Sequence, residues 1–188
     1  KTGAIKYDAD MSPLSGAAHK ISAEYLFPYL AHTAMEPLNC TVHITGQGAA
    51  AKADLWVGTQ APGWEVATAA RILGIDVKNV SVHIPMAGGG FGRRATPACD
   101  YVSEACQIAK ATRAAGIDAP VRMLWSREDD VKGGFYRPMH LHRAEIGFDA
   151  QGKVLAWDHV TVGQSFAKGT AFEGFMITNG VDTTTVEG

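Results

Sequence analysis

The spacing of apolar and polar residues changes several times along the chain, and each change marks a predicted element. Apolar residues alternate with polar ones in five short stretches, a period typical of half-buried β-strands. These stretches are residues 21–26, 40–45, 53–59, 80–84 and 121–125. Two further stretches, 141–148 and 153–162, flank a short loop with Gly152 at its end, and this arrangement predicts a β-hairpin.

Two other stretches repeat apolar residues every three to four positions, as amphipathic helices do. The first follows Pro62 and ends before Gly74, a residue type suited to a helix C-terminus. The second is predicted to begin with Thr96 as N-cap and Pro97 at the first helical position, and to end at Gly116. Its buried stripe is predicted to consist of Val102, Ala105, Ile108, Ala109 and Thr112.

This order of strands, helix, strand, helix and hairpin predicts an α+β fold with mixed strands and two main helices, rather than a doubly wound parallel sheet. Residues 1–20 are rich in Gly, Ala and Ser and are interpreted as an irregular lead-in. Residues 21–188 show neither an internal repeat nor a linker, so they are predicted to form one domain. Because the chain begins with Lys1 rather than Met, we expect it to be a fragment of a longer subunit.

Composition narrows the class of protein. With 46% hydrophobic and 19% charged residues and a net charge of −2, the 188-residue chain is typical of a globular protein. Its basic residues are scattered, which argues against nucleic acid as a partner. No apolar run reaches the roughly 18 residues that a transmembrane segment needs. Cys40, Cys99 and Cys106 form no Cys-x-x-Cys pair, so we expect buried thiols and no iron–sulfur or structural zinc site in the chain.

The most unusual segment is residues 86–94, with the sequence Met-Ala-Gly-Gly-Gly-Phe-Gly-Arg-Arg. Glycine loses more backbone entropy on folding than other residues, so a folded domain gains from such a run where φ is positive or where another group approaches closely. The run lies between a predicted strand and a predicted helix, where exposed N–H groups can bind an anionic ligand. Its spacing matches neither the dinucleotide-binding nor the phosphate-loop fingerprint. A flexible loop without a ligand is the alternative.

Three other segments carry candidate chemistry. Gln60 follows a predicted strand, and its amide can both donate and accept, which suits an oxo ligand or a pterin edge; a solvated loop side chain is the alternative. Glu36 lies in an extended stretch and is either catalytic or an anchor for its loop. The acidic residues 128–130 are interpreted as solvated charges at a strand end rather than as a metal site. His140 and His142 face one way on a predicted strand, without identifiable further zinc ligands.

Together these segments resemble the molybdopterin-binding large subunit of the xanthine oxidase and aldehyde oxidoreductase family, in particular its isoquinoline 1-oxidoreductase beta-subunit branch. The interval between Gln60 and Phe91 also fits that family. Five motifs appear in the family's order: Ala-Met-Glu-Pro at 34–37, Gly-Thr-Gln at 58–60, Gly-Gly-Gly-Phe-Gly at 88–92, Trp-Ser-Arg-Glu at 125–128 and Tyr-Arg-Pro at 136–138.

The resemblance implies a molybdenum-dependent oxidoreductase that binds molybdopterin, in its cytosine dinucleotide form, and hydroxylates an aldehyde or an N-heteroaromatic substrate. Gln60 and Phe91 are then expected close to the molybdenum, with Gln60 within hydrogen-bonding distance of one of its oxygen ligands, while no protein side chain binds the metal directly. Electrons are expected to leave to iron–sulfur clusters on a partner subunit. The resemblance favours a periplasmic or membrane-associated location over a cytoplasmic one. The residues implied to lie along the cofactor are Gly89, Gly90, Phe91 and Gly92.

The chain departs from the family's pattern at two points. In purine-oxidising members, a glutamate that holds the substrate follows the Gly-rich motif, and Ala95 stands there instead, after Arg93 and Arg94. These three residues are the candidates for the substrate side, and purines are not expected as substrates. The family's catalytic glutamate lies near the far end of a complete subunit, and nothing in residues 1–188 matches it. We therefore expect no catalytic residue in this chain and no turnover by the chain alone.

Two other classes of protein are kept as hypotheses. In the first, a non-catalytic interaction domain docks an acidic partner through the Gly-rich loop and an exposed Arg93–Arg94 pair. In the second, the same glycines and arginines bind the phosphate of a flavin or a nucleotide. Bound molybdenum and pterin would separate the enzyme fragment from both alternatives.

Overall fold

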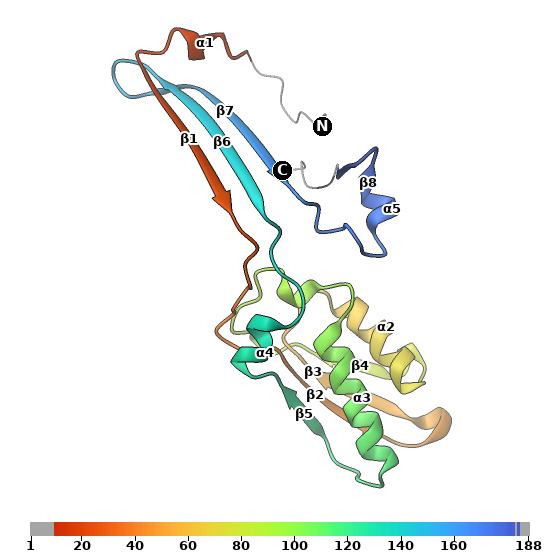
Figure 1. Cartoon of the computed structure of the whole chain (residues 1–188). Helices are drawn as coiled ribbons and strands as arrows, with labels where there is room; N and C mark the ends of the chain where they lie inside the picture. The colour runs from red at the N-terminus through yellow and green to blue at the C-terminus, as the bar shows by residue number, and fades with distance from the viewer. Residues whose placement is uncertain (1–9, 183, 185–188) are drawn as a thin grey trace. The chain divides into compact units, whose positions relative to one another are not determined.

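The computed structural model describes residues 10–182 and residue 184, and these form two compact units (Figure 1). Unit 1 comprises Lys1–Leu30 and Arg137–Gly188, and unit 2 comprises Ala31–Tyr136. Apart from residues 10–20, the described residues of both units lie within the range that the sequence analysis treated as one domain. The order of elements confirms the predicted α+β class, and no helix in the described part of the chain is long and apolar enough to span a membrane.

Unit 2 is built on a mixed sheet of four strands. From one edge to the other these are β4 (Val80–His83), β3 (Lys52–Trp56), β2 (Asn39–Thr45) and β5 (Val121–Leu124). The strand β2 pairs antiparallel with β3 and β5, and β3 pairs parallel with β4. All four strands lie where alternation predicted them, although β3 ends three residues early because the chain leaves the sheet for the turn at 58–60.

Two helices, α2 (Pro62–Leu73) and α3 (Asp100–Ala114), pack against the sheet of unit 2 and against each other (Figure 1). The predicted end of α2 is confirmed, because Gly74 adopts the left-handed conformation there, with a φ of 72°. Burial of apolar side chains between sheet and helices forms the core. Its members that are at most 1% exposed are Leu38, Cys40, Val42, Ala53, Leu55, Val57, Ala69, Tyr101, Val102, Ala105 and Cys106.

The predicted start of α3 is wrong. The helix begins at Asp100 rather than at Pro97, because Cys99 takes a left-handed conformation with a φ of 44° and interrupts the helical path. The hydroxyl of Thr96 therefore caps no helix and instead contacts Asp100 at 3.3 Å. The predicted stripe is confirmed at Val102, Ala105 and Ala109, whereas Ile108 is 40% exposed.

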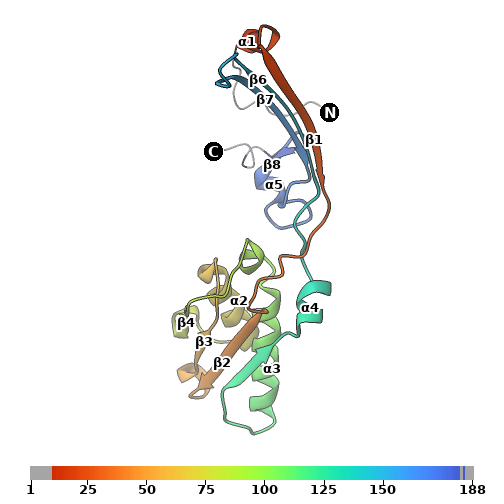
Figure 2. The ribbon, with the colours of Figure 1, turned by 90° about the vertical axis from the view of Figure 1, so that its left-hand side faces the viewer.

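Unit 1 contains a three-stranded antiparallel sheet with β6 (His140–Phe148) between β1 (His19–Phe27) and β7 (Val154–Gly163), so the predicted hairpin is confirmed (Figure 2). The lead-in is not wholly irregular. Ser12–Ser15 form the short helix α1, and β1 already begins at His19. Residues 1–9 of the lead-in lie outside the described residues. The remaining elements of unit 1 are α5 (Glu173–Met176), β8 (Ile177–Thr178) and β9 (Val181–Asp182).

Candidate functional site

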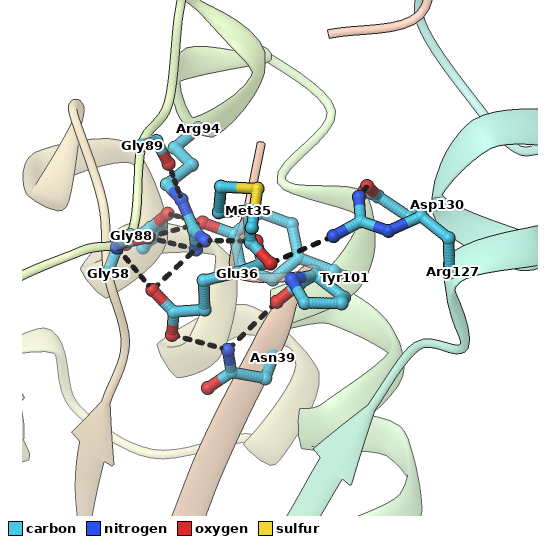
Figure 3. A network of polar contacts seen from close by, with 12 residues as sticks. Met35, Glu36, Asn39, Gly58, Gly88, Gly89, Arg94, Tyr101, Arg127 and Asp130 are labelled. Carbon is cyan, nitrogen blue, oxygen red and sulfur yellow. Dashed lines mark hydrogen bonds and ion pairs between the residues drawn. The ribbon is translucent and has the colours of Figure 1, made fainter. Parts of the chain in front are cut away.

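The guanidinium of Arg94 joins three loops of unit 2 (Figure 3). Its side chain is 1% exposed. Nε donates to the carbonyl oxygen of Gly89 at 2.7 Å, Nη1 to that of Gly58 at 3.2 Å, and Nη2 to that of Glu36 at 3.0 Å. These acceptors belong to three of the motifs singled out in the sequence. One buried cation therefore holds the Gly-rich segment, the Gln60 turn and the Glu36 segment together.

The carboxylate of Glu36 anchors the Gly-rich segment from the opposite side. Its Oε2 accepts the Gly88 N–H at 2.6 Å and lies 3.3 Å from Nη2 of Arg94, while its Oε1 accepts from Nδ2 of Asn39 at 2.7 Å. Burial by itself would raise the pKa of Glu36. The hydrogen bonds from Gly88 and Asn39 and the charge of Arg94 outweigh that effect and lower it. Of the two interpretations of Glu36, these contacts support the loop anchor.

The segment 126–132 supports the Glu36 loop, and the prediction of solvated charges at a strand end holds for Glu128 and Asp129, which are exposed, but is wrong for Asp130, which is buried. Arg127–Lys132 form the short helix α4, which opens with a capping box between Ser126 and Asp129. From this helix Arg127 donates to the carbonyl oxygen of Met35 at 2.9 Å and pairs with Asp130, which is 7% exposed (Figure 3). Of the acidic run, Asp130 thus contributes to packing, and the described residues contain no group of three side chains that could hold a metal ion.

Other loops approach two positions of the Gly-rich segment so closely that a side chain there would displace its neighbour. A Cβ atom at Gly88 would lie 2.5 Å from the Cβ of Glu36, and one at Gly90 would lie 2.5 Å from Oε1 of Gln60. Both distances are far below van der Waals contact. The close approach expected of the glycine run is confirmed, and it occurs between parts of the protein itself.

Gln60 and the Gly-rich segment together present a row of hydrogen-bond donors. Oε1 of Gln60 accepts the Gly92 N–H at 3.1 Å, and since an N–H can only donate, the Nε2 donor of the same amide points away from that contact. Within the described chain, the N–H groups of Gly89, Gly90 and Phe91 have no acceptor. Gly89 and Phe91 have positive φ values of 102° and 55°. Successive N–H groups in such a backbone form a concavity that binds anionic oxygens.

The arginine pair is buried rather than exposed, which corrects its interpretation as a surface feature. Arg93–Ala95 form a short 3₁₀ turn, in which the Arg93 side chain is 4% exposed. Both terminal nitrogens of Arg93 pair with Asp100, at 3.0 and 2.6 Å, and its guanidinium lies 5.6 Å from the ring centre of Trp125. Neither guanidinium is available to an acidic partner or to a substrate. Of the three substrate-side candidates, Arg93 and Arg94 have their charges buried and paired within the protein, and only Ala95 carries no charge.

Two functional candidates in this region were not identified from the sequence. Glu65 on α2 is 2% exposed, and Tyr101 on α3 is 1% exposed. The Tyr101 hydroxyl lies 3.0 Å from the carbonyl oxygen of Gly58 and 3.2 Å from Oε1 of Glu65. Burial raises the pKa of Glu65 to about 7, although the hydroxyls of Thr59 and Tyr101 and the Arg94 charge oppose the change. The available signal was the position of Glu65 four residues before the fully buried Ala69.

The cysteines are free and buried, as predicted. Three of the seven histidines lie together in unit 1. Nδ1 of His142 on β6 lies 3.1 Å from Nε2 of His159 on β7, and His140 lies beside His142 on the same face. The described residues contain no group of three side chains that could hold a metal ion, and this applies to these histidines as well. A hollow of about 380 Å³ adjoins His140 and His142. It is lined by Tyr25, Phe27, Pro28, Leu30, Arg137, Pro138, His140 and His142.

Comparison with known proteins gives consistent results. A family described as the molybdopterin cofactor-binding domain matches residues 4–184. The beta subunit of isoquinoline 1-oxidoreductase from Brevundimonas diminuta is 35% identical over 133 residues, which cover 70% of this chain and 16% of that protein. The aldehyde oxidoreductase molybdenum-binding subunit PaoC of Escherichia coli (strain K12) is 32% identical over 156 residues, or 83% of this chain and 20% of that protein. The chain thus spans a fifth or less of the length of these relatives.

Solved structures share the fold. Quinoline 2-oxidoreductase from Pseudomonas putida 86 matches with a TM-score of 0.59 and 21% identity, over 83% of this chain and 19% of that one. The aldehyde oxidoreductase of Desulfovibrio gigas matches with a TM-score of 0.56 and 16% identity, over 82% of this chain and 16% of that one. At these identities the likeness concerns the fold alone.

Proposed function

Because the chain belongs to the molybdopterin cofactor-binding domain family, we propose that unit 2 contributes one wall of a molybdenum cofactor site. The family resemblance indicated by the five sequence motifs is confirmed. Within that wall, Gln60 and residues 89–92 are the proposed contacts with the cofactor.

The observation that carries this proposal is the row of unpaired donors beside Gln60. The N–H groups of Gly89, Gly90 and Phe91 suit the oxygen atoms of an anionic cofactor, and they have no acceptor within the described residues. The side chain of Phe91 is 63% exposed and can cover such a ligand. The residues present therefore fit the cofactor that the family is described as binding.

Each element of the site has a proposed task. When bound, the molybdenum cofactor supplies the redox chemistry of an oxidative hydroxylation. The Nε2 group of Gln60 donates a hydrogen bond to an oxygen of the cofactor, and the N–H groups of residues 89–91 hold it from the adjacent side. Arg94 and Glu36 do not contact the cofactor and instead fix the positions of these two loops. Pre-organised donors of this kind stabilise charge without reorganising during the reaction.

The substrate and partners are proposed from the relatives. Ala95 replaces the carboxylate that would recognise a purine, so we favour an aldehyde or an N-heteroaromatic compound. The names of the relatives, an isoquinoline oxidoreductase and an aldehyde oxidoreductase, support these two classes. On the resemblance alone we propose that the iron–sulfur clusters lie on a partner subunit; the three cysteines of this chain are buried and free. We propose the cytosine dinucleotide form of the cofactor on the resemblance alone, and we expect no turnover from this chain by itself.

The proposal is tested by measuring molybdenum and pterin on the full-length subunit, purified with its partner from a host that supplies the cofactor. Elemental analysis and pterin fluorescence after oxidation should both approach one equivalent. Gln60→Ala should retain about 10-fold less molybdenum, because a residue that supports a metal centre typically contributes that much affinity. Phe91→Ala should lose cofactor during washing, because its ring shields the site.

Matched controls separate these effects from nonspecific damage. Gln47→Ala alters an exposed glutamine elsewhere in unit 2, and Phe166→Ala removes a ring that is 61% exposed, close to the exposure of Phe91. Both controls should keep the wild-type content. If molybdenum and pterin are absent from the wild-type protein, the proposed function is wrong.

A further inference from the structure

A buried polar chain runs beneath the turn that carries Gln60. It starts at Glu65 on α2, passes through the Tyr101 hydroxyl on α3, and ends at the carbonyl oxygen of Gly58. Figure 3 shows Tyr101 beside Gly58 and Arg94. The two O···O distances are 3.2 and 3.0 Å, so both contacts are hydrogen bonds. Neither Glu65 nor Tyr101 lies among the donors assigned to the cofactor.

Hydrogen bonding along this chain depends on whether Glu65 carries a proton. The Tyr101 hydroxyl has one hydrogen and two acceptors within reach, the carbonyl oxygen of Gly58 and Oε1 of Glu65. An ionised Glu65 can only accept, so it competes with Gly58 for that hydrogen. A protonated Glu65 donates to Tyr101 and leaves the tyrosine hydrogen for Gly58. Only the protonated form satisfies both contacts at once.

Charge balance favours the same form. Arg94 is already paired with the carboxylate of Glu36 at 3.3 Å, so a second carboxylate at Glu65 would leave a net negative charge in the core. Oε2 of Glu65 is buried without a hydrogen-bond partner of good geometry, and the Thr59 hydroxyl, which favours the carboxylate, is outweighed by the effect of burial on the pKa. An unpaired oxygen is far less unfavourable in a neutral carboxylic acid than in a buried carboxylate.

The other titratable groups around Glu65 do not change charge near neutral pH. Burial raises the pKa values of all three thiols, that of Cys106 to about 12. Burial likewise raises the pKa of Tyr101. Arg94 stays charged at every relevant pH. Glu65 is thus the group that titrates in this core, and burial places its pKa at about 7.

We propose that Glu65 is a positioning residue that holds the turn at 58–60 through Tyr101 while it is protonated, and that its ionisation withdraws this support. Loss of the Tyr101 hydrogen bond leaves the Gly58 carbonyl to Arg94 alone and loosens the turn that presents Gln60. The inference rests on the proposed function only in that Gln60 faces the cofactor. The site is then firmest at mildly acidic pH and loosens as the pH rises through neutrality.

The first test requires no cofactor. Denaturant unfolding of the full chain is followed from about pH 5 to about pH 8 for the wild type and Glu65→Gln, whose amide can donate to Tyr101 as the protonated acid does. The folded state raises the pKa of Glu65, so the wild type loses stability as the pH climbs from about 4.5 to about 7, whereas the amide does not. The ratio of the two unfolding constants should change by roughly a hundredfold. A ratio that stays constant overturns the proposal.

Infrared spectroscopy tests whether Glu65 is protonated in the wild-type chain, even if Glu65→Gln does not fold. At about pH 6 the wild-type chain should show the C=O stretch of a protonated carboxylic acid, which disappears at higher pH. Tyr101→Phe should shift that band, because it removes the hydrogen-bond partner of the acid. A spectrum without the band at about pH 6 overturns the proposal.

The second test uses the complete subunit with its partner. Wild-type protein should release molybdenum several-fold faster as the pH rises through about 7, while Glu65→Gln should release it at a pH-independent rate and Tyr101→Phe should release it fast throughout. Glu104→Gln and Tyr136→Phe are matched controls, since Glu104 is exposed on α3 and the Tyr136 hydroxyl donates to main-chain oxygens of α4. Identical pH profiles for wild type and Glu65→Gln contradict the inference. A wild-type protein purified without molybdenum contradicts the proposed function. The unfolding and infrared experiments still test the role of Glu65 in that case.

Discussion

The strands of units 1 and 2 share the same alternation of apolar and polar residues, yet their apolar side chains are buried in unit 2 and exposed in unit 1. In unit 2, Val42 and Leu55 are fully buried between the sheet and the helices α2 and α3. In unit 1, Ile21 and Trp157 lie on one face of a sheet whose strands have a comparable pattern, and they remain 56% and 59% exposed, as does Leu26 on the other face at 65%. Alternation therefore identifies the residues that share a face, and packing alone decides whether that face is covered.

The two units differ in buried charge as well. Unit 2 buries four ionisable side chains, and each has a polar contact with another group of unit 2: Glu65, Arg93, Arg94 and Asp130. Buried charge is tolerated where partners are fixed, and it becomes strongly destabilising when one partner is removed. Unit 2 should therefore be far more sensitive to polar and apolar substitutions than the three-stranded sheet of unit 1.

The largest effect is expected from Arg94→Leu. This change leaves the Glu36 carboxylate without its counter-charge and removes the donor for the carbonyl oxygens of Gly89 and Gly58, so unit 2 should lose about 3–5 kcal/mol in free energy of unfolding. Urea denaturation measures the loss, and hydrogen exchange should locate it in residues 31–136. Arg143→Leu on the exposed part of β6 should change stability by less than about 0.5 kcal/mol. Equal losses for the two variants would refute the contrast between the units.

Leu55→Ala and Leu26→Ala compare the same substitution on a covered and an uncovered face. Leu55 is fully buried, so its truncation should destabilise the protein by about 3 kcal/mol through lost burial and the cavity left behind. Leu26 is 65% exposed, and its truncation should have an effect below about 0.5 kcal/mol. The two variants are compared by their denaturant midpoints, which report stability when the m-value is the same as in the wild type. A loss at Leu26 as large as that at Leu55 would show that its face of β1 is covered in solution.

Glu36→Gln should destabilise unit 2 by about 2 kcal/mol near neutral pH, since it weakens charged hydrogen bonds to Gly88 and Asn39. The pKa of Glu36 is lowered in the folded state, so its contribution is complete above the unfolded value near 4.5 and is lost as the pH falls through the folded value. The difference between variant and wild type should therefore vanish in acid. This dependence is opposite in sign to that of Glu65, and unfolding curves over a pH series distinguish the two. A difference that persists unchanged in acid would rule out the charged anchor.

The smallest effect is expected from Ser126→Ala, which removes the capping box of α4 and should destabilise the protein by about 1 kcal/mol. Because Arg127 on this helix holds the Met35 carbonyl, amide exchange should accelerate in α4 and at residues 35–36. The exposed Ser81 on β4 offers a matched control, and Ser81→Ala should leave exchange in α4 unchanged. Accelerated exchange in β6 and β7 instead would contradict the assignment of α4 to unit 2.

Part of the site was predictable because it depends on residue type within a short window. Three glycines in succession indicated a close backbone approach, and the structure places Gly88 and Gly90 against Glu36 and Gln60. The resemblance singled out Gln60 and the Gly-rich segment, and the Gly92–Gln60 hydrogen bond brings them together. Their contact with a cofactor stays a prediction.

Other features were not predictable, since the partners involved lie far apart in the sequence. Arg93 and Arg94 were interpreted as surface residues because the local sequence does not show which carboxylates pair with them or that the fold buries the two guanidinium groups. Their partners are Asp100, which follows an unexpected left-handed residue, and Glu36, which lies 58 positions away. Glu65 likewise became a candidate only when the fold placed it against Tyr101.

The sequence by itself determined the α+β class, the positions of the main strands and helices, and the family, because apolar periodicity and ordered motifs are properties of the chain alone. Only the tertiary structure decided which alternating strands are covered and which loops meet at Arg94. It also decided the direction in which each carboxyl pKa shifts, since burial and long-range hydrogen bonds set the opposite shifts of Glu36 and Glu65. Those energies arise from groups brought together by folding, and no local pattern in the chain records them.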